Sequence, residues 1–251
     1  MTDSPTEKAA RAISKSRLTV ALTGAGISVE SGIPPFRGPG SIWEKIDPME
    51  FAHIDSFMKN PGRVWEVLVK GLKDVLDTAQ PNKGHLSLAA LESRGLLSAI
   101  ITQNVDSLHQ RAGSQDVIEF HGTFARLYCL ECAQEIPMEK LSITTFPPTC
   151  PGGGIYRPDC VFFGENIPME ALQRSQELAS ACDVMLVVGT SAVVNPAAMM
   201  PVIAKTNGAT IIEVNPMPTP LTSATTDIFL QGGAGEVLSS LLQACPIPTG
   251  A

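Results

Sequence analysis

The stretch Thr23-Gly24-Ala25-Gly26-Ile27-Ser28-Val29-Glu30-Ser31-Gly32-Ile33-Pro34-Pro35-Phe36-Arg37-Gly38 follows an apolar run, residues 18–22, that is typical of a buried parallel strand. Glycines directly after such a strand let the backbone approach a phosphate, and they leave N–H groups free to bind it. The pattern departs from the dinucleotide fingerprint G-x-G-x-x-G, because Val29 occupies the third glycine position. A Pro/Gly-rich segment with one Phe and one Arg follows where a crossover helix is usual, so we expect a loop to wrap the bound group.

Composition limits the classes of function that this chain can have. Its 251 residues suffice for one large domain, or for one large domain with a small insert. A net charge of −7 argues against non-specific binding to nucleic acid or to anionic membranes, and 5% aromatic residues indicate no base-stacking platform. No apolar run approaches the ~20 residues that span a bilayer. The polar start, residues 1–17, does not resemble a signal peptide, so we expect a cytoplasmic protein.

Strands and helices alternate along most of the chain, which predicts an α/β fold with a Rossmann-like, doubly wound parallel sheet. We expect strands at 18–23, 97–102, 117–120, 184–188, 209–214 and 226–230. We expect helices at 5–16, 83–93, 169–181, 197–206 and 234–243, and a helix that Asn60-Pro61 opens.

The stretch 124–160 interrupts this alternation with four cysteines, several prolines and a glycine run. The sequence therefore predicts three units: a Rossmann-like, dinucleotide-binding domain (1–44, 81–123 and 161–251), a helical part of a small domain (45–80) and an inserted Cys-containing module (124–160).

Small or polar residues follow the first five strands of this predicted sheet. Ligands of open parallel sheets bind at these carboxyl ends. Each segment alone has an ordinary explanation as a turn or a helix cap, but together they predict a binding site. The segments are Gly24-Ala25-Gly26, Gln103-Asn104-Val105-Asp106, His121-Gly122, Gly189-Thr190-Ser191 and Asn215-Pro216.

The order of these segments and the residues in them resemble those of the sirtuins, the NAD-dependent protein deacylases, over about residues 10–243. The resemblance includes the glycine stretch quoted above and four further motifs. These are Thr102-Gln103-Asn104-Val105-Asp106, Phe120-His121-Gly122, Arg157-Pro158 with Val161-Phe162-Phe163-Gly164-Glu165, and Gly189-Thr190-Ser191 with Val193-Val194.

The resemblance implies cleavage of the nicotinamide–ribose bond of NAD by an acyl-lysine amide oxygen, with transfer of the acyl group to ADP-ribose. Asn104 and Asp106 match residues that contact the nicotinamide carboxamide, for which their side chains supply a donor and an acceptor. His121 is the expected general base, because its ordinary pKa of about 6.5 suits proton transfer near neutral pH. His85 and His53 are read as ordinary residues of the helical region, and His109 as helix structure beside the site.

The same resemblance assigns binding roles to two further sets of residues. Phe36 shields the nicotinamide pocket, Gln103 binds ribose hydroxyls, and Ser191, at an expected helix start, suits phosphate. The NAD-binding set is Gly24, Ala25, Gly26, Ser28, Phe36, Arg37, Gln103, Asn104, Asp106, Gly189, Thr190, Ser191 and Asn215. An acyl-lysine peptide is expected to add as a strand between two segments, with Val161 and Phe163 lining the lysine tunnel. The substrate set is Val161, Phe163, Gly164, Glu165, Val193 and Val194.

The Cys-containing module departs from the family pattern. Cys129, Cys132 and Cys150 match three of the four thiolates of a structural zinc site, but Pro151-Gly152-Gly153-Gly154 follows without a fourth cysteine. Zinc held by three thiolates with water, Cys160 or another group is one interpretation. A metal-free module that folds by packing is the other, and the sequence leaves both open.

The acyl preference and the reaction class also have alternatives. Sirtuins that prefer acidic acyl groups carry a Tyr and an Arg where this chain has Leu68 and Gly71, which favours acetyl or another neutral acyl group here, although Lys70 could partly compensate. A protein mono-ADP-ribosyltransferase using the same site and a non-catalytic NAD-sensing scaffold are the alternative functions. A thiol-redox function depends on Cys129 and Cys132 alone and lacks the expected βαβ context.

Overall fold

The computed structural model describes residues 3–36, 40, 41, 44, 46–141 and 143–246. Six parallel strands form the main sheet in the order β3-β2-β1-β7-β8-β9. Counted along this sheet, the strand order is that of the Rossmann fold, with its switch point between β1 and β7. The predicted fold class is thus confirmed. The strands are β1 (Thr19–Thr23), β2 (Ala99–Thr102), β3 (Val117–Glu119), β7 (Val184–Val188), β8 (Thr210–Asn215) and β9 (Ile228–Gln231).

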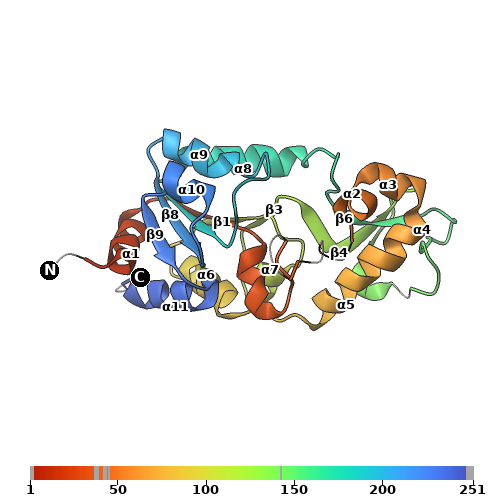
Figure 1. Ribbon diagram of the computed structural model, residues 1–251, viewed down its shortest axis with the longest axis horizontal. Coiled ribbons are helices and arrows are strands. Elements are labelled where there is room, and N and C mark those ends of the chain that lie inside the picture. The colour runs from red at the N-terminus through yellow and green to blue at the C-terminus, as the bar shows by residue number, and fades with distance from the viewer. Residues whose placement is uncertain (1–2, 37–39, 42–43, 45, 142, 247–251) are drawn as a thin grey trace.

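Helices cover both faces of the sheet (Figure 1). One face packs against α1 (Pro5–Lys15), α6 (Lys83–Ser93) and α11 (Ala234–Ala244). The other face packs against α8 (Met169–Ala181), α9 (Met199–Thr206) and α10 (Pro220–Ala224). Neighbouring residues of one strand therefore enter different cores: Ala21 joins the first, and Val20 and Leu22 join the second. This two-sided burial explains why β1 and β7 read as continuous apolar runs.

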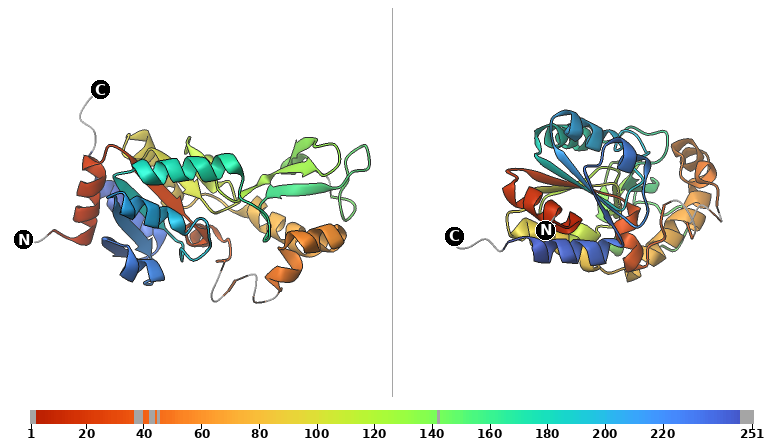
Figure 2. Two further views of the ribbon diagram at one scale, coloured as in Figure 1. Left: turned by 90° about the horizontal axis from the view of Figure 1, so that it is seen from above. Right: turned by 60° about the vertical axis from the view of Figure 1, so that its left-hand side comes forward.

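A smaller lobe lies beside the sheet (Figures 1 and 2). It contains a three-stranded antiparallel sheet of order β5-β4-β6 and a set of short helices. Side chains from both parts share a third core that includes Phe57, Trp65, Leu127 and Tyr156. The bounds are β4 (Gly122–Cys129), β5 (Glu135–Pro137), β6 (Tyr156–Cys160), α2 (Pro48–Phe51), α3 (Ile54–Lys59), α4 (Pro61–Val64), η3 (Trp65–Val69), α5 (Lys70–Thr78) and η4 (Met138–Lys140).

The helix expected after Asn60-Pro61 forms, and it runs without interruption through α4, η3 and α5. The Asn60 side chain accepts the Arg63 N–H at 3.2 Å, and Pro61 occupies the first turn. The middle segment, η3, is a π-helix that buries Trp65 and Leu68. The residue boundaries of the three predicted units remain predictions. In the described part of the chain, no helix is long and apolar enough to cross a membrane.

Candidate functional site

The glycine loop packs directly on the end of β7. The Gly24 N–H donates to the Val188 carbonyl at 3.0 Å, and the Gly26 N–H donates to the Gly189 carbonyl at 2.8 Å. A Cβ on Gly26 would lie 2.7 Å from the Gly189 Cα, closer than real Cβ contacts allow. The expectation that these two N–H groups are free to bind phosphate is therefore wrong. The glycines are required because the two loops at the switch point touch.

A short 3-10 helix, η1 (Ala25–Ser31), replaces the first crossover helix that a Rossmann unit usually has. It ends at Gly32, whose φ of 86° is left-handed. The chain then reaches Phe36, which is 39% exposed and whose ring centroid lies 6.2 Å from that of Phe163. Arg37, which the sequence assigned to NAD binding, lies outside the described residues. The wrapping segment thus begins beside the residues assigned to the substrate.

Ser28, Asn104 and Asp106 meet at the end of β1, as the motifs predicted. The Ser28 hydroxyl donates to Asp106 Oδ2 at 2.7 Å. Asn104 Nδ2 donates to the Gly24 carbonyl and to Ser28 Oγ, each at 3.1 Å. The loop between β2 and α7 (Leu108–Arg111) is therefore tied to the glycine loop through side chains. Both amide protons of Asn104 are used in these bonds, so the donor expected of Asn104 is occupied within the protein. Asn104 Oδ1 and the Asp106 carboxylate remain as acceptors for the N–H groups of a carboxamide.

His121 lies in the turn between β3 and β4, half-buried. Its Nδ1 lies 3.0 Å from the Gln103 carbonyl oxygen. A carbonyl oxygen only accepts, so Nδ1 carries the proton and Nε2 keeps its lone pair. Burial lowers the pKa of His121, and the bond to the Gln103 carbonyl opposes that effect. The neutral imidazole with a free Nε2 is the form that a general base requires.

Thr190 connects the residues assigned to the ribose contacts. Gln103 Nε2 donates to Thr190 Oγ1 at 3.0 Å, and Asn215 Nδ2 donates to the Thr190 carbonyl at 2.9 Å. Ser191 is exposed, but it does not begin a helix, because α9 starts only at Met199. The expected helix N-terminus at Ser191 is therefore wrong, and the ends of β2, β7 and β8 converge on Thr190 instead.

The segment assigned to the peptide is only partly available for strand addition. The Phe163 N–H donates to the Ala52 carbonyl at 2.8 Å, and its carbonyl accepts the Ile54 N–H at 3.0 Å. The Glu165 carboxylate accepts from Arg157 Nη1 and Nη2 and from the Phe162 N–H. The backbone of Phe163 and the side chain of Glu165 thus serve the protein itself. Gly164, with a φ of 88°, and the exposed Val193 remain at the surface.

Three of the predicted metal ligands form a cluster. Cys129, Cys132 and Cys150 place their Sγ atoms within 4.8 Å of one another, and the Cys129–Cys150 and Cys132–Cys150 distances are 3.6 and 3.9 Å. Cys160 is not part of this cluster; burial raises the pKa of its thiol to about 12. Three soft sulfur donors at these distances fit a zinc ion with a fourth ligand from elsewhere.

Two buried histidines pack against each other beside Ser28. The sequence placed His109 in helix structure beside the site, but it read His85 as an ordinary residue of the helical region. His85 Nε2 lies 3.4 Å from Ser28 Oγ, and the His85 and His109 ring centroids are 4.9 Å apart. Burial lowers the pKa of His85 to about 4 and that of His109 to about 3. His85 Nδ1 also accepts the Asn82 backbone N–H at 3.3 Å, so the ring helps to cap the start of α6.

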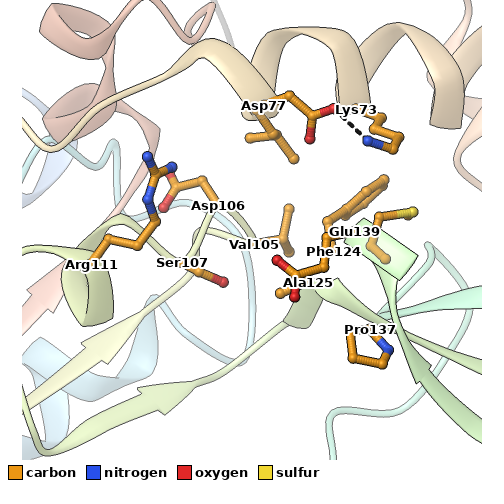
Figure 3. Close-up of a pocket in the computed structure, with 12 residues that line it drawn as sticks. Lys73, Asp77, Val105, Asp106, Ser107, Arg111, Phe124, Ala125, Pro137 and Glu139 are labelled. Atoms are coloured by element: carbon orange, nitrogen blue, oxygen red, sulfur yellow. Dashed lines mark hydrogen bonds and ion pairs between the residues drawn. The ribbon is translucent and has the colours of Figure 1, made fainter. Parts of the chain in front are cut away.

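A cavity of about 430 Å³ lies behind the loop that carries Asp106 (Figure 3). Val105 and Phe124 lie on its apolar side, and the ion pair of Lys73 with Asp77 lies on α5 at its edge. The Phe124 N–H donates to the Val105 carbonyl at 3.0 Å, which joins the loop to β4. The loop that carries Asn104 and Asp106 therefore lies between the main sheet and the small lobe.

The family model described as "Sir2 family" matches residues 24–196, so the chain belongs to the Sir2 family. It is 47% identical over 232 residues to NAD-dependent protein deacylase 2 of Pyrobaculum aerophilum, covering 92% of each chain. It is 44% identical over 238 residues to NAD-dependent protein deacylase 1 of Archaeoglobus fulgidus, covering 94% of this chain and 96% of the relative.

Solved structures agree with this assignment. A Sir2 homolog–NAD complex has a TM-score of 0.88 and 44% identity, covering 94% of this chain and 92% of that one. A Sir2–p53 peptide–NAD⁺ structure has a TM-score of 0.85 and 38% identity, covering 93% and 95%. The resemblance to sirtuins is thus confirmed over nearly the whole chain.

Proposed function

We propose that this chain is an NAD-dependent protein-lysine deacylase that releases nicotinamide and transfers the acyl group to ADP-ribose. Its similarity to the named deacylases over more than nine-tenths of their length supports this activity. The observation in this chain that carries the proposal is the hydrogen bonding of the His121 imidazole. A neutral imidazole with its Nδ1–H bonded to the Gln103 carbonyl leaves Nε2 able to take a proton.

The chemistry requires a weak nucleophile, an amide oxygen, to displace nicotinamide from the ribose. Positioning and electrostatics must therefore lower most of the barrier. Asn104 and Asp106, held by Ser28 and the Gly24 carbonyl, orient the carboxamide of the leaving group. His121 accepts the proton of a ribose hydroxyl, so that this oxygen attacks the acyl carbon. The bond from the acyl carbon to the lysine nitrogen then breaks, the lysine amine leaves with a proton, and a water molecule adds to the acyl carbon. The original amide oxygen stays on the ribose, and the acyl group stays on the hydroxyl oxygen that attacked it.

The acyl group that this site accepts is neutral. Leu68 is buried in the core of the small lobe, and Gly71 has no side chain to offer. Lys70 lies over the Phe146 ring at 5.9 Å, so its ammonium already has a partner. An acidic acyl group would therefore enter a pocket without a fixed guanidinium. Acetyl-lysine is the substrate that we expect to be consumed faster than succinyl-lysine.

An acetyl-lysine peptide assay with and without NAD tests the function. We expect nicotinamide, deacetylated peptide and O-acetyl-ADP-ribose by mass spectrometry. His121→Ala should retain NAD binding by calorimetry and lose at least about a hundredfold in kcat, the contribution of a general base. Because burial lowers the His121 pKa, the acid limb of the kcat profile should lie below pH 6.5, the ordinary value for histidine. Gain of ADP-ribose on protein would instead support the transferase, and NAD binding without turnover would support the scaffold.

We also propose that Cys129, Cys132 and Cys150 hold a structural zinc ion. Cys129 is the last residue of β4, whereas His121 precedes the first residue of that strand, so the ion would stabilise the fold rather than take part in the reaction. Elemental analysis of protein purified without chelators should find zinc, and Cys150→Ala should lose it. A folded protein without metal would support the metal-free module.

A further inference from the structure

Two buried hydroxyl groups join the ends of neighbouring strands directly beneath the loop that carries Asn104. Thr23, the last residue of β1, and Thr102, the last of β2, are register partners, and they are 0% and 3% exposed. Thr23 Oγ1 donates to Thr102 Oγ1 at 2.9 Å. Thr102 Oγ1 also accepts the Asn104 backbone N–H at 3.1 Å. The position of the Thr102 hydroxyl therefore helps to set the position of the Asn104 backbone.

His109, on α7, completes this chain of bonds. Its ring is 1% exposed, and its Nε2 lies 2.9 Å from Thr23 Oγ1. The Thr23 hydroxyl has a single proton, which it donates to Thr102, so it accepts from His109. The proton of the neutral ring is therefore on Nε2.

The other ring nitrogen supports this tautomer. His109 Nδ1 is buried and has no hydrogen-bond partner among the residues that the structure describes. If the proton were on Nδ1, an N–H group would be buried without an acceptor, which is rarer in proteins than an unpaired lone pair. The bare Nδ1 still has a desolvation cost. A leucine of similar size would avoid it, so packing alone does not account for a histidine here.

We propose that His109 is a positioning residue: its Nε2–H fixes the Thr23–Thr102 hydroxyl pair and thereby the backbone N–H of Asn104. Through this relay the protein holds the loop so that Asn104 and Asp106 face the leaving group. This role rests on the proposed deacylase function. His109 is 1% exposed, so it acts through these hydrogen bonds and not by contact with a substrate. The relay connects α7 to β1 and β2 and acts on the backbone of the loop, whereas Ser28 and the Gly24 carbonyl hold the Asn104 and Asp106 side chains.

Two substitutions separate the donor from the packing. His109→Leu keeps an apolar volume and removes the donor, whereas His109→Gln offers a side-chain N–H at a similar reach. We expect His109→Leu to lower kcat about tenfold or more, as displaced supporting groups do, with little change in the KM of the acetyl peptide. His109→Gln should restore most of kcat. Both variants are compared at a temperature where circular dichroism shows them folded.

Two outcomes would overturn the proposal. If His109→Leu and His109→Gln lose kcat equally, the side chain acts by packing, and if neither loses kcat, the relay has no effect on the loop. Thr23→Val should reproduce the loss, and the Thr23→Val/His109→Leu double variant should be no worse than either single variant, because both break one chain of bonds.

A measurement without turnover keeps the inference separate from the proposed function. Nitrogen-15 spectra of histidine-labelled protein report which ring nitrogen of His109 carries the proton. We expect the Nε2-protonated, neutral ring in the wild-type chain, and its loss as a distinct signal in His109→Gln assigns it. An Nδ1-protonated ring would contradict the relay even if the protein deacetylates peptides. An inactive protein with the Nε2-protonated ring would contradict the proposed function alone.

Discussion

At the residue scale, contact between two loops explains Gly189 better than ligand binding does. Gly189 follows β7 with a φ of 60°, and a Cβ there would lie 2.4 Å from the Ile27 backbone nitrogen. Gly208 is also left-handed, with a φ of 92°, but nothing lies within 4 Å of the Cβ position. The two glycines share the same backbone constraint and differ only in their surroundings.

Gly189→Ala and Gly208→Ala therefore form a matched pair. Each should lose about 1 kcal/mol because alanine is strained in the left-handed region. Gly189→Ala should lose a further 1–3 kcal/mol, roughly the cost of overpacking, because Ile27 and Gly26 must move. Urea denaturation gives both free energies of unfolding, and calorimetry should find weaker NAD binding only in Gly189→Ala. Equal losses in the two variants would contradict the contact argument.

At the scale of elements, Arg157 holds the loop that follows β6. Its side chain is 4% exposed and donates to Glu165 and to the Cys160 carbonyl. Its guanidinium also lies over the Phe162 ring at 4.9 Å from the centroid. Burial lowers the pKa of Arg157, and its bonds to Glu165 raise it with the larger combined effect. The loop that presents Gly164 is thus fixed from inside the small lobe.

Arg157→Met should cost about 3–5 kcal/mol of unfolding free energy, because it leaves the Glu165 carboxylate without its cation in a half-buried place. The Arg157→Met/Glu165→Leu double variant should recover part of this loss, since it removes both charges. Denaturant titrations of the two single variants and the double variant give the coupling energy. Additive losses would mean that Arg157 and Glu165 act independently.

For the whole molecule, the paired histidines make stability depend on pH. His85 and His109 lie where α6 and α7 meet β1, and burial lowers their pKa values to about 4 and about 3. In the unfolded chain both titrate near 6.5. Below that pH the unfolded state binds more protons than the native state, so stability is complete above about 6.5 and decreases as the pH falls toward about 4.

The wild-type chain should lose up to about 2.7 kcal/mol per pH unit from these two groups between pH 6 and pH 4. His109→Gln should lose about half as much per unit, because one buried imidazole no longer titrates. Unfolding free energies of the two proteins, measured across this range, give the difference, in which the carboxylates cancel. Parallel curves would show that His109 has the same pKa folded and unfolded.

Local patterns predicted the main sheet and most of its helices. The helix 169–181 and the strand 184–188 match α8 and β7 residue for residue, since amphipathic periodicity and a continuous apolar run are both local properties. The motif residues Asn104 and Asp106 were predicted together and lie together. The cytoplasmic location and the absence of nucleic-acid binding stay predictions of composition.

The sequence by itself determined the strands, the family and the chemical groups that the site contains, because these depend on residue type and short spacing. Only the tertiary structure decided how those groups are used. It pairs the Gly24 and Gly26 N–H groups with the carbonyls at the end of β7 and just after it, the Phe163 backbone with residues just after α2 and at the start of α3, and His109 with Thr23. The physical reason is that hydrogen-bond partners far apart in the chain are chosen by which strands become neighbours, and no local pattern states that choice.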